Sequence, residues 1–159
     1  MKQTLRQTFS GLALMGGASL AILFASWLTL PVPVVKDSLQ TELLSIHVYR
    51  EGDYQSWYPE DMVQRQTARA ITDRMALCRE RNTLRKAREV LGEAPEIQLY
   101  FRTEDTYRVV YLGSRENPGK VTGWTACQDR KGLAARIQDP ADLEDYILEQ
   151  IGGELFPDV

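Results

Sequence analysis

The sequence has few of the side chains that most often carry catalysis or hold metals. Its 159 residues include two cysteines, Cys78 and Cys127, and one histidine, His47. These are too few soft ligands for a Cys/His zinc site. It also lacks the serine nucleophile elbow, the HExxH zinc motif, the EF-hand loop and the dinucleotide-binding fingerprint. The sequence therefore predicts no catalytic residue, no metal site and no cofactor.

An excess of positive charge is missing too. The formal net charge is −3, which argues against a general nucleic-acid binder, so we expect no nucleic-acid partner. Hydrophobic residues make up 43% of the chain and charged residues 26%. This composition is typical of a folded domain and argues against wholesale disorder.

One long stretch lacks charge altogether, between Arg6 and Lys36. Residues 9–30 within it are mostly apolar and as a helix would rise about 33 Å, enough to cross a hydrocarbon core of about 30 Å. We therefore predict one transmembrane helix over residues 9–30, followed by a proline-rich exit linker over residues 31–36. The alternative interpretation is a cleaved signal peptide, which would leave a secreted binder or inhibitor.

The flanking charges predict an orientation for this helix. Lys2, Arg6 and the amino terminus precede it, whereas Lys36 on the other side is balanced by Asp37. The positive-inside rule then places residues 1–8 in the cytoplasm. Residues 37–159 would form an extracytoplasmic, periplasmic domain anchored in the inner (cytoplasmic) membrane.

Small side chains recur at every fourth position along the predicted transmembrane helix. Helices in lipid associate by close packing of such stripes, because lipid already solvates large apolar groups. We expect a helix-packing seam for other transmembrane helices of a complex, or for a second copy of the chain. The seam consists of Ala13, Gly17, Ala21, Ala25 and Thr29.

The remainder predicts a small α+β domain. Apolar residues at helical spacing indicate two central helices, one after Pro59 and one capped by Thr83 and carrying Leu84, with a break near 81–82. A third helix begins at Asp139 as N-cap, with Pro140 at its first position. A further short helix is predicted over residues 37–44.

Alternating and β-branched runs predict the strands of this domain. Short connections between them favour antiparallel neighbours in a sheet of three to five strands. Residues 54–58 are either a returning strand or an aromatic loop. The runs cover residues 44–50, 97–102, 107–112 and 120–128.

The stretch from Thr83 to Pro95, TLRKAREVLGEAP, followed by three strands, resembles the SmpA/OmlA (BamE-like) group of small envelope lipoproteins. The resemblance covers residues 62–129 and rests on Thr83, Val90, Leu91, Gly92, Pro95 and Trp124. Two residues separate Gly92 from Pro95 where the group has one, and the lipid-bearing cysteine is missing. The resemblance implies a two-helix, three-strand domain that acts by protein contacts at the cell envelope.

Cys78 and Cys127 form a candidate disulfide. An extracytoplasmic compartment permits such a bond, and a helix packed on a sheet could bring the two cysteines together. The alternative is two buried, reduced thiols. His47, on a predicted strand, is interpreted as a structural histidine.

Arginines crowd the two predicted central helices, whereas residues 139–159 carry seven acidic residues and no basic one. The arginines and nearby aromatics are a candidate surface for a protein partner or for the lipid bilayer. The alternatives are solvated charged faces and aromatics in the core. The candidate surface comprises Trp57, Tyr58, Arg65, Arg69, Arg79, Arg85 and Arg88.

Together these features favour a non-enzymatic, single-pass membrane protein that acts through protein–protein contacts. It would be an accessory, scaffolding or assembly subunit of a larger membrane complex. A membrane-tethered enzyme with a site that leaves no sequence motif is the alternative from another class.

Overall fold

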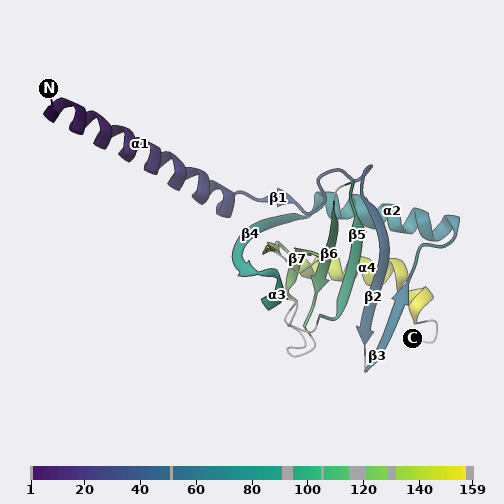
Figure 1. The fold of residues 1–159 in the computed structure, drawn as a ribbon. Helices are drawn as coiled ribbons and strands as arrows, with labels where there is room; N and C mark the ends of the chain where they lie inside the picture. The colour runs from purple at the N-terminus through teal and green to yellow at the C-terminus, as the bar shows by residue number, and fades with distance from the viewer. Residues whose placement is uncertain are drawn as a thin grey trace. The chain divides into compact units, whose positions relative to one another are not determined.

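The computed structural model describes residues 2–50, 52–90, 95–104, 106–114, 121–128 and 132–156, and the side chains of 2–15 and of Arg50 lie outside the description. The chain forms two compact units, Met1–Leu30 and Pro31–Val159. The first unit is the helix α1, Lys2–Thr29, drawn in purple in Figure 1. It ends where the Leu30 backbone N–H donates to the Ser26 carbonyl at 2.9 Å.

The prediction of a transmembrane helix over residues 9–30 is overturned. Within the part of the chain that the structure describes, no helix is both long enough and apolar enough to cross a membrane. The predicted single-pass anchor is therefore not supported.

The predicted helix-packing seam loses its transmembrane setting with the anchor. Gly17, Ala21, Ala25 and Thr29 are exposed on α1, and the side chain of Ala13 lies outside the description. The Thr29 hydroxyl donates to the Ala25 carbonyl at 2.7 Å, as hydroxyls in helices commonly do.

The second unit is built on an eight-stranded antiparallel sheet with the strand order β1-β4-β8-β7-β6-β5-β2-β3 (Figure 1). The sheet is therefore larger than the three to five strands that the sequence predicts. Its strands are β1 Val32–Pro33, β2 Glu42–Arg50, β3 Asp53–Trp57, β4 Arg79–Lys86, β5 Ile97–Arg102, β6 Tyr107–Leu112, β7 Gly123–Cys127 and β8 Leu133–Ile137.

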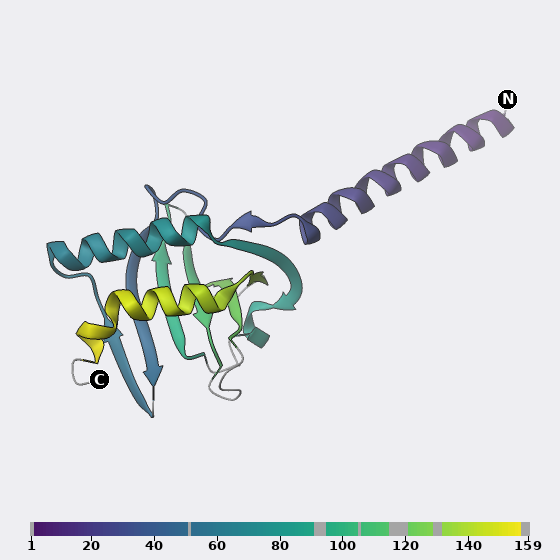
Figure 2. The ribbon, with the colours of Figure 1, turned by 180° about the vertical axis from the view of Figure 1, so that it is seen from behind.

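Two long helices cover one face of this sheet. Helices α2 (Met62–Leu77) and α4 (Pro140–Leu155) run side by side across it, as Figure 2 shows from behind. The core lies between them and the sheet. The largest fully buried side chains of the domain include Ile46, Ile71, Met75, Leu99, Phe101, Leu143, Ile147 and Ile151.

The starts of the two helices differ in their caps. Asp61 caps α2: its carboxylate accepts the Gln64 N–H at 2.8 Å, and the Gln64 amide oxygen accepts the Asp61 N–H in return. At α4 the predicted N-cap Asp139 has a left-handed backbone, with φ of 49°, and its side chain makes no cap hydrogen bond. Pro140 takes the first turn of α4, as predicted.

The predicted second central helix is wrong, because residues 79–86 form strand β4. Of the described residues of the predicted helix, only Ala87–Val90, α3, are helical, and Leu91 lies outside the described residues. The segment RERNTLRK consists largely of good helix formers, but pairing with β8, for example Glu80 with Ile137, overrides that propensity. The helix predicted over 37–44 is also absent, since residues 42–50 belong to β2.

Candidate functional site

The face of the sheet opposite α2 and α4 carries a cluster of aromatic side chains around His47. Alternation along β2 turns Ile46 and Val48 into the core, and therefore sends His47 to the other face. The register pairs His47 with Ser56 on β3 and with Gln98 on β5. We call this cluster the His47 surface, and it consists of Ser45, His47, Tyr54, Ser56, Tyr58 and Tyr100.

Three tyrosine rings pack around the imidazole of His47. The Tyr54 ring stacks on it with centroids 5.6 Å apart and planes 9° from parallel. The rings of Tyr58 and Tyr100 meet it edge-on, at 6.0 Å and 5.2 Å. These distances lie in the range in which aromatic pairs attract one another. The three tyrosines and His47 therefore form one contiguous aromatic cluster on the surface.

Both ring nitrogens of His47 are engaged by hydroxyls. Nδ1 lies 2.7 Å from Ser56 Oγ and Nε2 lies 3.1 Å from Ser45 Oγ. Burial lowers the pKa of His47, so its ring is neutral at pH 7. A neutral ring donates through one nitrogen and accepts through the other. A serine-based hydrolytic triad would need a carboxylate where Ser45 stands.

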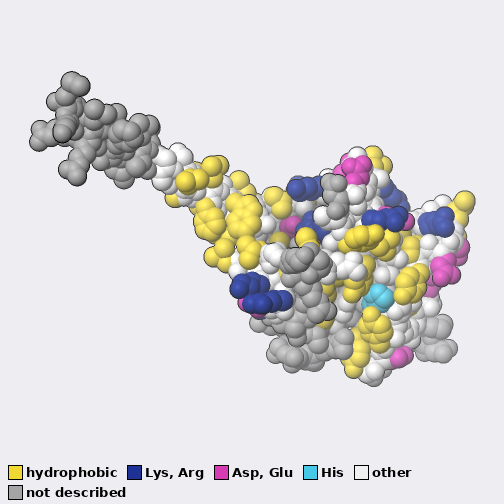
Figure 3. Space-filling model, viewed as in Figure 1, with side chains coloured by type: hydrophobic (Ala, Val, Ile, Leu, Met, Phe, Trp, Pro, Cys, Tyr) yellow, Lys and Arg dark blue, Asp and Glu magenta, His cyan; other side chains and the backbone are white. Residues whose placement is uncertain are grey.

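The His47 surface is open to solvent at its tyrosines. The exposed fraction is 51% for Tyr54 and 49% for Tyr58. Figure 3 shows the histidine, in cyan, among yellow hydrophobic side chains on this face of the molecule. Tyrosine is enriched in protein interfaces, because its rigid ring buries apolar area while its hydroxyl still hydrogen-bonds.

The structure separates Trp57 from Tyr58, two neighbours that the sequence assigns to one candidate surface. Tyr58 lies on the His47 surface, but Trp57 is only 4% exposed and belongs to the core. Its indole N–H donates to the Glu154 carboxylate of α4 at 2.8 Å. The prediction of a partner surface at Trp57 is therefore wrong.

The predicted arginine residues do not gather on one helical face. Arg65 and Arg69 lie on α2, where Arg69 donates to the Ser38 carbonyl and pairs with Asp73 at 3.2 Å. Arg79 and Arg85 lie on β4 and Arg88 on α3. The guanidinium carbon of Arg85 stands 4.9 Å from the ring centroid of Trp124.

The predicted disulfide is not formed. Cys78 and Cys127 are free, the first half-buried and the second exposed. Cys78 precedes β4 at the end where Glu80 pairs with Ile137, whereas Cys127 lies at the end of β7 near Leu133. These ends are separated by about 13 Å along β8, and a disulfide needs Cα atoms within about 7 Å.

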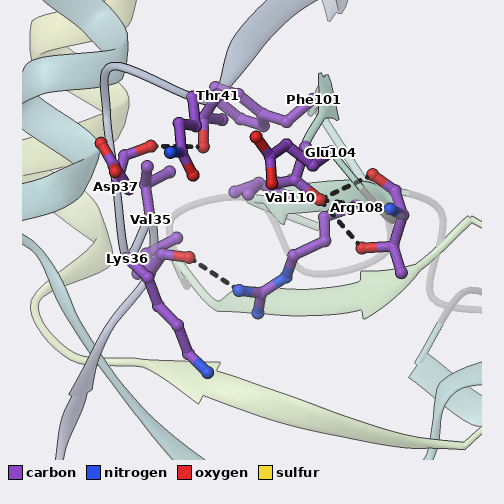
Figure 4. Close-up of a pocket in the computed structure, with 12 residues that line it drawn as sticks. Val35, Lys36, Asp37, Thr41, Phe101, Glu104, Arg108 and Val110 are labelled. Atoms are coloured by element: carbon purple, nitrogen blue, oxygen red, sulfur yellow. Dashed lines mark hydrogen bonds between the residues drawn. The ribbon is translucent and has the colours of Figure 1, made fainter.

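A cavity of about 340 Å³ opens at one end of the sheet, between the loop 34–41 and the β5–β6 hairpin (Figure 4). Its apolar walls come from Val34, Val35, Phe101 and Val110, which are 1–6% exposed overall. Lys36, Asp37 and Glu104 also line it. Its size is at the lower end of the range for small-molecule sites, about 300–1,000 Å³.

Arg108 lines the cavity and is held by three partners. Its guanidinium donates to the Val34 carbonyl at 2.8 Å, the Glu80 carboxylate at 2.8 Å and Thr125 Oγ1 at 3.1 Å. Thr125 in turn donates to the other oxygen of Glu80, which is 4% exposed. The charge of Arg108 is therefore matched by a buried carboxylate.

The sequence analysis missed Tyr100, Ser45 and Ser56 as partners of His47. Alternation along the predicted strand 97–102 places Tyr100 on the other face of the sheet from Leu99 and Phe101. This pattern could have identified Tyr100 as a residue outside the core. The cavity leaves no such signal, because its walls come from a loop and a hairpin about 60 residues apart in the sequence.

Among the described residues, no group of three or more His, Cys, Asp or Glu side chains could hold a metal ion. No protein family matches the chain, and no curated protein or solved structure matches it either.

Proposed function

We propose that this protein acts without catalysis, through protein–protein contacts, as an accessory, scaffolding or assembly subunit of a larger complex. The His47 surface is its contact site. The observation that carries this proposal is the exposure of Tyr54 and Tyr58, about half of each residue, on a sheet face that α2 and α4 leave free.

The ring contacts and hydrogen bonds within the cluster support a binding role. Tyr54 stacks on His47 in the free protein, and the histidine is fixed by Ser45 and Ser56. A partner would therefore immobilise little side-chain motion on binding. Aromatic anchors that are ordered before binding are typical of interface hot spots.

The lowered pKa and the hydrogen bonds of His47 favour a binding role over a catalytic one. Its lowered pKa leaves few protonated molecules at pH 7, and both nitrogens already have hydroxyl partners. In a hydrolytic triad, a carboxylate orients the histidine that activates the serine. Here the hydroxyl of Ser45 stands where that carboxylate would be, so His47 cannot activate Ser56 in this way.

Site-specific photo-crosslinking tests the proposal. A photoreactive phenylalanine analogue is placed at Tyr54 or Tyr58 of the full chain in its native cells. We expect a discrete protein adduct at both positions, with another protein or with a second copy of this chain. The control is Tyr107, which is 49% exposed and pairs with Arg102 at the start of β6.

A paired substitution completes the test. Tyr54→Ser with Tyr58→Ser should abolish recovery of the crosslinked protein, while Tyr107→Ser should retain it. Adducts at Tyr54 and Tyr58 no more abundant than at Tyr107 would contradict the proposal, as would undiminished recovery by the double variant.

A further inference from the structure

The cavity beside Arg108 has an uneven charge distribution. Four charged side chains line it: Lys36, Asp37, Glu104 and Arg108. Arg108 is neutralised by the buried Glu80, as its 2.8 Å ion pair shows. Figure 4 shows the Lys36 side chain extending away from Asp37 and Glu104. With Arg108 neutralised, Lys36 and the two carboxylates leave a net negative charge at the cavity.

Glu104 is the carboxylate best placed to meet a ligand. In Figure 4 it lies on the side of the cavity where Thr41 and Val110 lie. Its side chain is exposed, and within the described part of the chain it makes no hydrogen bond or ion pair. Asp37, by contrast, already accepts the Leu39 N–H at 2.9 Å.

The apolar walls of the cavity favour an apolar group in the part of the cavity away from Glu104. Val35 and Val110 face the cavity from opposite sides, and Phe101 adds an aromatic ring. An apolar group that enters displaces water from these walls at little cost, whereas a charged group there would lose hydration without a partner.

We propose that this cavity binds a small organic ammonium ion: an apolar body of about one aromatic ring against Val35, Phe101 and Val110, with its ammonium group on the Glu104 carboxylate. This site is independent of the His47 surface. The occupant is selected by charge complementarity, since the cavity offers a free carboxylate and no free cation directed into it.

Methyl NMR spectra of the full chain, with labelled valines, test the site directly. The probe is 2-phenylethylammonium, and its matched controls are neutral 2-phenylethanol and anionic 3-phenylpropionate. We expect saturable shifts of the Val34, Val35 and Val110 methyls with a dissociation constant in the millimolar range. The neutral and anionic analogues should bind at least about fivefold more weakly.

Two substitutions test whether the Glu104 carboxylate recognises the ammonium group of the probe. Glu104→Gln should weaken binding of 2-phenylethylammonium about fivefold and leave 2-phenylethanol unaffected. Glu149→Gln, at an exposed glutamate on α4, is the matched control and should change neither. Both positions are on the surface, so the variants should keep the wild-type methyl spectrum.

Four results would overturn the inference. They are the absence of saturable shifts up to 50 mM probe (about fiftyfold above a 1 mM constant), equal binding of the three analogues, an unchanged affinity in Glu104→Gln, and binding of a capped Leu–Lys peptide where the free amine does not bind. The last would assign the cavity to a basic peptide in place of a small molecule.

Discussion

The indole N–H of Trp57 reaches across the domain to the carboxylate of Glu154, 97 positions later in the chain, at 2.8 Å. The same Glu154 oxygen accepts the side-chain N–H of Gln64 at 2.9 Å. One carboxylate thus ties the edge strand β3 and the first turn of α2 to the last turns of α4.

Glu154→Ala should destabilise the domain by about 1–2 kcal/mol, because it removes both hydrogen bonds and leaves the buried indole N–H unpaired. Trp57→Phe should cost a similar amount while it keeps most of the buried ring. Urea unfolding measures both. Glu149→Ala, at an exposed position of α4, is the control. Equal midpoints for Glu154→Ala and Glu149→Ala would contradict this role.

Glu80→Ala should cost about 3–5 kcal/mol, because it leaves the Arg108 guanidinium partly buried without its counter-charge. The exposed pair of Arg102 and Glu42 is the matched comparison, with side chains 53% and 58% exposed. Glu42→Ala should cost less than about 1 kcal/mol. Denaturant melts of the two variants test the contrast, and similar losses of stability in both would refute it.

Glu144 should make stability fall as the pH rises. Burial, followed by repulsion from Glu96 and Asp145, raises the pKa of Glu144 to about 7 from 4.5. The folded state therefore holds a proton that the unfolded state has released, so stability is fully present below pH 4.5 and is lost between about pH 4.5 and 7.

Glu144→Gln should reduce this pH dependence and stabilise the domain at pH 8 by on the order of 1 kcal/mol, a value discounted for the half-exposed side chain. Unfolding free energies between pH 4 and 8 test this, with Glu149→Gln as the control. A carboxyl titration by NMR that places the midpoint of Glu144 near 4.5 would exclude the effect.

His47 should titrate below its ordinary pKa of 6.5, because burial disfavours the imidazolium form. A histidine whose folded pKa is lowered contributes stability above pH 6.5 that is lost as the pH falls through and below that value. Proton NMR of the imidazole checks the midpoint. A value above 6.5 would show that Ser45 and Ser56 stabilise the charged ring.

Apolar alternation and helical spacing predicted the strands β2, β5, β6 and β7 and the helices α2 and α4, because apolar residues of each of these elements are buried in the domain. Strand β4 lacks such a buried apolar pattern, because only Glu80 of its first six residues is fully buried and that residue is charged. Its structure is decided by pairing with β8, a partner about 50 residues away that local sequence cannot reveal.

The candidate site was predicted only in part. Tyr58 was placed on a contact surface from sequence, but its neighbour Trp57 turned inward because successive residues near a strand end point to opposite faces. The pairing of His47 with Ser56 depends on the β2–β3 register, and the cavity depends on a loop whose course the sequence does not specify.

The strand order has a consequence for biosynthesis. Strands β5 to β8 neighbour one another in chain order, but β4 and β2 join this meander from opposite sides, at β8 and at β5. A chain emerging from the ribosome exposes β4 with only the two-residue strand β1 as a partner until β8 has been synthesised. Glu80 and Arg108 also meet only in that completed sheet. The nascent domain therefore passes through a long interval with open strand edges, in which chaperone binding would protect it from mispairing.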